Sequence, residues 1–304
     1  MSHRTAWMSV GAVVLALVPQ PSQAQQSKPA PKQVPDGVKA QRDIDYTGAG
    51  KKSQMLDLYV PERASALLPV VIWIHGGSWR SGSKEGCPAL PLTTRGYAVA
   101  SINYRLTDEA VFPAQIEDCR AAIRWLRSNA SKYHIDPSKI GVWGASAGGH
   151  LAALLGTAAD AKGWDGVGNF SDQSTLVQAV CDYFGPVDFL HKFNPDRASG
   201  PNSPVARLLG GPLKDKQEDA RTASPLTYVS KGDSPFLIVH GDMDALVPLD
   251  QSRLLLDALK KNGVSAQLIV VTNGKHGPFG AECDPNPDQI RASVFGFFDR
   301  NLKK

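Results

Sequence analysis

Near-continuous apolar runs constrain the fold of this 304-residue chain more than any other feature of its sequence. They occupy residues 70–74, 98–102, 140–143, 177–181, 236–239 and 268–271. Runs without alternating polar residues are typical of strands that are covered on both faces. Segments with helical periodicity separate most of these runs. We therefore expect an α/β fold, in which a mostly parallel sheet carries helices on both faces.

The clearest helical pattern follows Pro113, where apolar residues recur at a spacing of three or four from Ile116 to Leu126. Two further helices are expected at about 250–260 and 290–302. Residues 42–47 and 55–60 alternate polar and apolar side chains, which predicts an antiparallel hairpin at the start of the fold.

A proline-rich stretch at residues 186–234 breaks the alternation of strands and helices. We interpret it as a cap-like excursion over the carboxyl edge of the sheet, where ligands bind in open α/β sheets. A plain surface insertion is the alternative.

The N-terminal residues 1–24 have the organisation of a signal peptide. His3 and Arg4 precede an apolar run at 10–18, and Ser22-x-Ala24 supplies small residues for cleavage after Ala24. That run is too short to span a membrane. We therefore expect export to the periplasm or the medium without a stable membrane anchor. Residues 25–40 are rich in Gln, Pro and Lys and are interpreted as a flexible tether before a single folded domain at 41–304.

Charge and cysteine content exclude some classes of function. The formal net charge is +4, from 33 basic and 29 acidic residues that form no stripe, so nucleic acid is not an expected partner. The four cysteines are Cys87, Cys119, Cys181 and Cys283. They allow three disulfide pairings, and buried free thiols are an equal alternative. The spacing of these cysteines matches no zinc-binding pattern. The oligomeric state is not decided.

The segment Gly144-Ala145-Ser146-Ala147-Gly148 predicts a strand, a sharp turn and a helix. Small residues on both sides of the serine allow a turn tight enough to present its hydroxyl to a base. The helix start behind Ser146 directs backbone N–H groups toward any negative charge that develops there. A helix-entry turn without chemistry remains the alternative for this motif alone.

Three loops that follow apolar runs carry the partners that a nucleophilic serine needs. They are His75-Gly76-Gly77-Ser78-Trp79, His240-Gly241-Asp242-Met243-Asp244 and Gly274-Lys275-His276. Parallel strands end at the same edge of a sheet, so these loops can converge on Ser146. A weak hydroxyl nucleophile requires a base, an orienting acid and donors for the oxyanion, and the loops supply all three types.

Taken together, these motifs resemble the α/β-hydrolase superfamily, and in particular its hormone-sensitive-lipase-like and bacterial feruloyl/acetyl esterases. The similarity spans residues 73–277. It includes His75-Gly-Gly-x-Trp79, Asn103-Tyr-Arg-Leu106, Gly144-Ala-Ser-Ala-Gly-Gly-His150 and His240-Gly-x-x-Asp244-x-x-Val-Pro248. Many lipase-like relatives have a third glycine where this chain has Ser78.

The resemblance implies a role for each matching residue. Ser146 would be the nucleophile, His276 the base and Asp244 the acid that orients it. The oxyanion would be bound by the backbone N–H groups of Gly76, Gly77 and Ala147. The resemblance implies no metal and no organic cofactor.

Other residues near these motifs have competing interpretations. Asp242 is a less favoured candidate for the acid, and His75 and His240 are expected to brace loops. Trp79 and Trp164 are candidates for substrate binding, with a structural role as the alternative for each.

Arg105 and Asp118 are expected to form a structural ion pair.

The sequence thus predicts an exported serine carboxylesterase that works through an acyl-enzyme intermediate. Its substrate would be a small-molecule or polysaccharide-linked ester, with acetyl or feruloyl esters of plant polysaccharide as the first candidates. A prolyl-oligopeptidase-like peptidase is one alternative, although Ala147 stands where such enzymes tend to have an aromatic residue. A non-catalytic binding protein on a hydrolase scaffold is the other.

Overall fold

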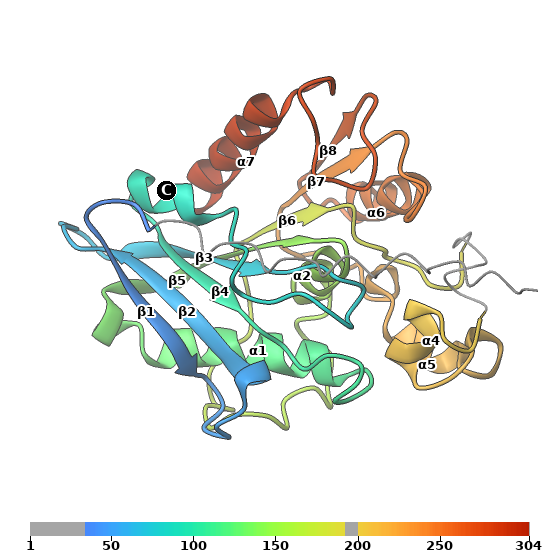
Figure 1. The fold of residues 1–304 in the computed structure, drawn as a ribbon, viewed down its shortest axis with the longest axis horizontal. Coiled ribbons are helices and arrows are strands. Elements are labelled where there is room, and N and C mark those ends of the chain that lie inside the picture. The colour runs from blue at the N-terminus through green and yellow to red at the C-terminus, as the bar shows by residue number, and fades with distance from the viewer. Residues whose placement is uncertain (1–33, 192–199, 304) are drawn as a thin grey trace, which may run out of the picture. The chain divides into compact units, whose positions relative to one another are not determined.

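A computed structural model describes residues 34–191 and 200–303 of the chain. The predicted signal peptide, 1–24, lies outside the described residues, as does most of the predicted tether. One sheet organises the described part, with strand order β1-β2-β4-β3-β5-β6-β7-β8 (Figure 1). The strands are β1 (Val38–Asp45), β2 (Met55–Pro61), β3 (Leu68–Ile74), β4 (Ala98–Ile102), β5 (Ile135–Ala145), β6 (Ala179–Tyr183), β7 (Phe236–Gly241) and β8 (Ala266–Val271).

The predicted mixed sheet is confirmed. Strand β2 is antiparallel to both β1 and β4, and the remaining neighbours are parallel. The boundary of the tether needs a correction, because β1 already begins at Val38, which pairs with Pro61. Residues 38–40 therefore belong to the sheet, and the predicted domain start at residue 41 falls too late.

Strand β3 shows why the central apolar runs do not alternate with polar residues. Successive side chains of a strand point to opposite faces, and here both faces are buried. Val70, Ile72 and Ile74 belong to the apolar cluster that packs against α1 (Ala114–Ser128) and α2 (Ala147–Thr157). Val71 and Trp73 belong to the cluster on the other face.

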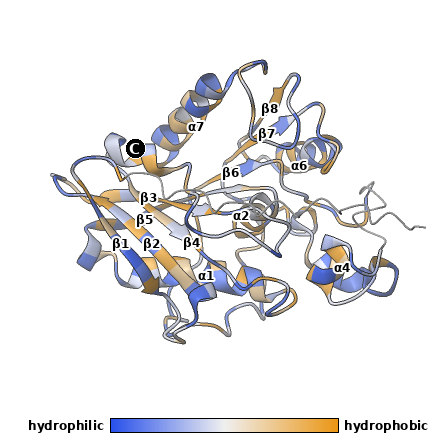
Figure 2. Cartoon of the chain, in the orientation of Figure 1, coloured by the Kyte–Doolittle hydropathy of each residue, from blue (hydrophilic) through white to orange (hydrophobic). Residues whose placement is uncertain are grey.

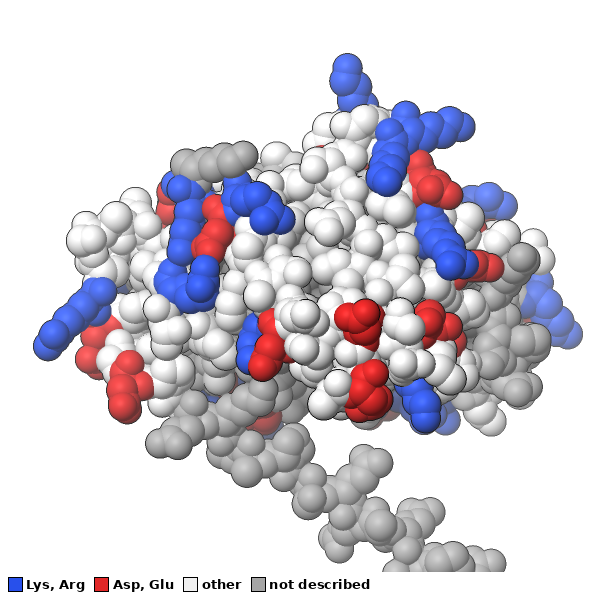
Figure 3. All heavy atoms as spheres, turned by 90° about the horizontal axis from the view of Figure 1, so that it is seen from above, with Lys and Arg blue, Asp and Glu red and all other residues white. Residues whose placement is uncertain are grey.

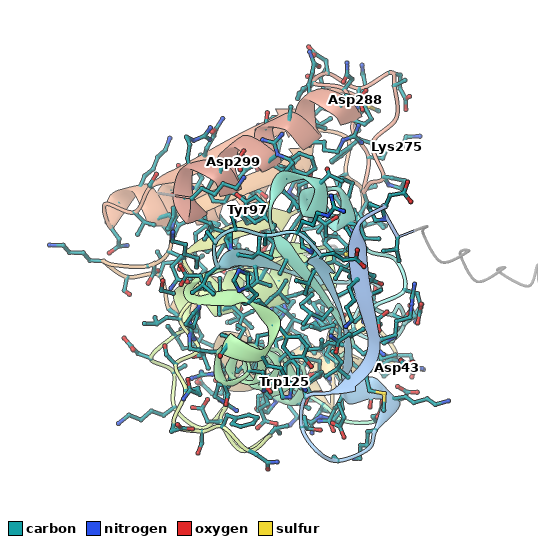
Figure 4. The ribbon with its side chains drawn as sticks, turned by 90° about the vertical axis from the view of Figure 1, so that its left-hand side faces the viewer. Asp43, Tyr97, Trp125, Lys275, Asp288 and Asp299 are labelled. Carbon is teal, nitrogen blue, oxygen red and sulfur yellow. The ribbon has the colours of Figure 1, made fainter. Side chains whose placement is uncertain are left out.

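The second face is covered by α7 (Pro287–Leu302) and the short helix η2 (Leu90–Arg95). The Tyr97 hydroxyl donates to Asp299 on α7 over 2.9 Å, and Figure 4 shows the two residues together. This bond attaches α7 to the chain directly before β4. Figure 2 shows hydrophobic residues along the strands and both hydrophobic and hydrophilic residues on the helices, including α6 (Asp250–Lys261).

The excursion at 186–234 contains α4 (Pro204–Leu209), α5 (Gln217–Thr222) and two short 3-10 helices in its described part. A backbone bond from the Phe112 N–H to Leu208 O over 2.8 Å attaches the excursion to the rest of the fold, and a bond from the Leu226 N–H to Val187 O over 3.1 Å joins its two ends. Pro204 and Val205 lie beside Ser146. The excursion therefore reaches the carboxyl edge of the sheet.

The four cysteines lie in the described part and are all buried, and Cys119, Cys181 and Cys283 are free thiols. The predicted ion pair is present, with the Arg105 Nε donating to Asp118 Oδ2 over 2.9 Å. Within residues 34–191 and 200–303, no helix has the length and hydropathy that crossing a membrane requires. The face drawn in Figure 3 carries small groups of acidic and basic side chains among uncharged residues.

Candidate active site

Ser146 occupies a sharp turn between β5, which ends at Ala145, and α2, which begins at Ala147. Its backbone has φ 56° and ψ −117°, a conformation that a residue with a side chain rarely adopts. The Ser146 N–H donates to Tyr183 O over 2.8 Å, which holds the turn against the end of β6. Strained residues of this kind concentrate at functional sites.

The glycines around Ser146 are required by space. A Cβ on Gly144 would overlap the carbonyl group of Gly148, and a Cβ on Gly148 would overlap the carbonyl oxygen of Ile74. The start of α2 therefore lies directly against the ends of β5 and β3. This close approach places the Ser146 hydroxyl above the edge of the sheet.

The structure brings the three predicted triad residues together. His276 Nε2 lies 2.8 Å from Ser146 Oγ, and His276 Nδ1 lies 2.6 Å from Asp244 Oδ2. Asp244 follows β7 and His276 follows β8, so three loops at one sheet edge supply the three side chains. Since an ionised carboxylate only accepts, Nδ1 carries the proton and Nε2 can accept one from the serine.

The Asp244 carboxylate is fully buried and surrounded by donors. Its Oδ1 accepts from the backbone N–H groups of Leu246 and Val247, and its Oδ2 accepts from His276 and also lies 3.2 Å from His240 Nε2. Burial alone would raise the pKa of Asp244, but the hydrogen bonds from His240 and His276 outweigh it and hold the pKa well below 3.8. Asp242, the less favoured candidate for the acid, is exposed.

The predicted oxyanion residues lie around the serine. A Cβ on Gly76 would come 3.3 Å from the Cβ of Ser146, so the loop after β3 passes directly beside this serine. Gly77 has φ +114°, which favours glycine. Ala147 is the first residue of α2, where a backbone N–H has no acceptor within the helix. Among the described residues, the N–H groups of Gly76 and Gly77 also have no backbone acceptor.

His75 braces this loop, as expected. Its Nδ1 lies 2.8 Å from Gly76 O, and its ring stacks on Tyr104 with a centroid distance of 4.3 Å. Burial lowers the pKa of His75 to about 4, so the ring is neutral at pH 7 and donates from Nδ1.

Trp79 lies in the site and also braces it. Its indole Nε1 donates to His150 Nδ1 over 3.2 Å, and His150 Nε2 lies 2.7 Å from Ala223 O. Burial lowers the pKa of His150 to about 4, so this ring is neutral at pH 7. The bonds connect the loop after β3 with α2 and with the excursion.

Trp164, the other candidate for substrate binding, has the structural position that was its alternative interpretation. Trp164 is buried in the apolar cluster on the α1 side, where its ring packs edge-on against Phe112 and Tyr228. It is not among the residues that line the small pocket beside Ser146. Both tryptophans lie in loops, and the path of the folded loops distinguishes them.

A small pocket opens directly beside Ser146, with a volume of about 20 Å³. Its walls come from the loop after β3, from the excursion and from the loop after β7. They are Ser78, Trp79, Pro186, Pro204, Val205 and Val247. Pro186, Pro204, Val205 and Val247 were not predicted as site residues, because nothing in an apolar side chain marks it as pocket lining rather than core.

His240 and Phe184 are the other residues that sequence patterns did not assign to the site. His240 was expected only to brace a loop, but it also contacts the buried acid. Phe184 follows β6, and its ring centroid lies 4.6 Å from that of His276. The described residues contain no group of three or more His, Cys, Asp or Glu side chains arranged to hold a metal ion.

Comparison with known proteins places this geometry in a family. The BD-FAE family model matches residues 56–259, which is more than half of the chain. Esterase LipC of Mycobacterium tuberculosis (strain ATCC 25618 / H37Rv) is 31% identical over 271 residues, which cover 84% of this chain and 66% of that protein. The chain spans 53% to 66% of the length of the first curated relatives it matches.

Solved structures of similar proteins agree with the fold. A truncated form of a carbohydrate esterase from gut microbiota has a TM-score of 0.78 and 34% identity, covering 88% of this chain and 97% of that one. A bifunctional GH43-CE protein of Bacteroides eggerthii has a TM-score of 0.80 and 36% identity, covering 86% of this chain and 35% of that one. The predicted α/β-hydrolase fold is thus confirmed, and the chain belongs to the BD-FAE family of that superfamily.

Proposed function

We propose that this protein is a serine carboxylesterase that hydrolyses short-chain esters through an acyl-enzyme intermediate. The observation that carries the proposal is the continuous relay from the Ser146 hydroxyl through His276 to the buried Asp244 carboxylate. Each atom in the relay has the donor or acceptor character that nucleophilic catalysis by serine requires.

The geometry supports a definite sequence of steps. His276 Nε2 takes the hydroxyl proton as Ser146 Oγ attacks the ester carbonyl, and Asp244 stabilises the imidazolium that forms. The N–H groups of Gly76, Gly77 and Ala147 receive the oxyanion, each contributing roughly 3 kcal/mol in comparable sites. The tetrahedral intermediate collapses as Nε2 returns its proton to the leaving alcohol. Water, activated by the same nitrogen, then releases the carboxylic acid.

The small pocket at Ser146 favours an acetyl group over a feruloyl group as the acyl part of the ester. Its volume of about 20 Å³ is on the scale of a methyl group or a water molecule. Val205 and Val247 are buried, and they bound the pocket together with Ser78 and Trp79 of the loop after β3. A bulky phenolic acyl group does not fit into this space without movement of these walls.

We further propose that the alcohol belongs to a polysaccharide and that the enzyme is exported. Support for the first point comes from the similar solved structures, two of which are named as a carbohydrate esterase and a GH43-CE protein. Support for the second comes from the signal-peptide pattern of residues 1–24.

Hydrolysis of 4-nitrophenyl acetate tests the proposed chemistry. Ser146→Ala is expected to lower kcat by about 10⁴-fold or more while the thermal unfolding temperature changes little. A fluorophosphonate should label the unchanged protein and should not label this variant. Equal turnover by the two proteins would reject the assignment of Ser146 as nucleophile.

A further inference from the structure

A second and larger cavity lies on the α7 side of the Ser146 turn. Its volume is about 440 Å³, which is within the range of small-molecule sites. We call it the aromatic cavity. It is lined by aromatic side chains and prolines, with a single basic residue, Arg291. The aromatic members are Trp73, Trp143, Tyr183, Phe184 and Phe279.

The aromatic cavity adjoins the catalytic residues. Ala145, directly before Ser146, lines it, and so does Pro278, two positions after His276. Phe184 also lines it while its ring contacts that of His276, at a centroid distance of 4.6 Å. The cavity therefore has lining residues that neighbour Ser146 in the chain and that contact His276.

The lining offers two kinds of contact. Trp73 and Trp143 are buried, with rings edge-to-face at a centroid distance of 5.6 Å, and Phe279 is half-buried. These rings give the cavity apolar walls. Arg291 is exposed and Tyr183 half-buried, so their polar groups can reach a ligand. The Tyr183 hydroxyl makes no hydrogen bond to a described residue, whereas Arg291 Nη2 donates to Asp288 over 2.5 Å.

We infer that the aromatic cavity binds a pyranose ring of the alcohol part of the ester. This inference rests on the proposed esterase chemistry, in which His276 gives its proton to the leaving alcohol. A sugar ring presents C–H groups on its faces and hydroxyls at its edge, so it suits aromatic walls with a few polar groups at the rim. The small pocket at Ser146 holds the acyl group, and the aromatic cavity holds the sugar.

Paired substrates test this assignment. An acetylated xylo-oligosaccharide carries the sugar, whereas 4-nitrophenyl acetate carries the same acyl group without it. Phe279→Ala and Arg291→Ala are each expected to raise KM for the oligosaccharide roughly five- to tenfold more than KM for 4-nitrophenyl acetate. Tyr183→Phe should shift the same ratio in the same direction. Arg300→Ala, also exposed on α7 but outside the lining, serves as the control and should shift neither KM.

A binding measurement separates failure of this inference from failure of the proposed function. Deacetylated xylo-oligosaccharide is titrated into Ser146→Ala, and tryptophan fluorescence reports occupancy of the cavity because Trp73 and Trp143 line it. Saturable quenching that Arg291→Ala weakens supports the sugar site, even if no ester is hydrolysed. The inference is overturned if the cavity variants change KM equally for both substrates, or if saturable binding is absent. It is also overturned if these variants lose activity on methyl ferulate alone, because the cavity would then hold the acyl group.

Discussion

His240 Nε2 lies 3.2 Å from Asp244 Oδ2, the same carboxylate oxygen that accepts from His276. His240 Nδ1 lies 2.6 Å from the Ser252 hydroxyl, and its Nε2 also lies 2.9 Å from Val247 O. Two acceptors at Nε2 and a hydroxyl at Nδ1 fix the tautomer with its proton on Nε2. A second histidine thus contacts the Asp244 carboxylate beside His276.

We expect His240→Asn to reduce kcat roughly tenfold to a hundredfold, because the freed Asp244 carboxylate orients His276 less well. Hydrolysis of 4-nitrophenyl acetate across pH 5 to 9 gives both kcat and the apparent pKa of the base. That apparent pKa should change in the variant, because His240 contacts the carboxylate that His276 contacts. A merely structural role of His240 would leave the apparent pKa unchanged. His134→Asn, an exposed histidine away from the site, is the matched control. An unchanged pH profile together with unchanged kcat would contradict the role of His240.

Asp244→Asn should lower kcat by about 10⁴-fold, because an amide favours the wrong tautomer of His276. Asp242→Asn makes the same chemical change at an exposed position two residues earlier and should retain activity. Both variants are compared on 4-nitrophenyl acetate, with circular dichroism to confirm folding. A larger loss in Asp242→Asn would show that the other carboxylate is the acid.

The three residues could be placed at one sheet edge from the sequence because each follows a strand that an apolar run marks, whereas their roles came from the family resemblance. Ser146 follows β5, Asp244 follows β7 and His276 follows β8, so sheet topology alone brings them to one edge. The fold class followed from the same runs. Boundaries were less accurate where polar residues continue a strand, as in β5, which starts at Ile135 and pairs there with Leu68.

The supporting residues could not be located in this way, because their roles depend on the path of loops. The contact of His240 with Asp244 requires the turn in which Leu246 and Val247 donate to the carboxylate. Trp79 and Trp164 have the same chemistry and belong to the same apolar cluster, yet Trp79 also lines the pocket at Ser146 and Trp164 does not. Only the folded structure separates such cases.

Asp182→Asn should remove one source of pH-dependent stability. Asp182 is buried at the end of β6, and burial raises its pKa from 3.8 to about 6. Because the folded state binds this proton more tightly than the unfolded state, the free energy of unfolding falls as pH rises through that window, by up to about 3 kcal/mol. As the pH rises from 4 to 7.5, the free energy of unfolding of the variant should therefore increase relative to that of the unchanged protein.

Urea unfolding at these two pH values measures that gain. Asp257→Asn, on the exposed side of α6, is the control and should show no such dependence. A stability difference between Asp182→Asn and the unchanged protein that is the same at both pH values would show that Asp182 does not titrate as inferred.

Val205→Ala should change the preferred length of the acyl chain. Val205 lies on α4, is fully buried and forms a wall of the pocket at Ser146, so removing two methyl groups enlarges that pocket. We expect the ratio of kcat/KM for 4-nitrophenyl butyrate to that for the acetate to rise roughly tenfold, the usual effect of one or two methylenes in an apolar pocket. Val264→Ala removes the same atoms from a buried position outside the pocket, so it controls for lost stability. An unchanged ratio in Val205→Ala, or an equal rise in both variants, would place the acyl chain elsewhere, because only a wall that touches the chain discriminates its length.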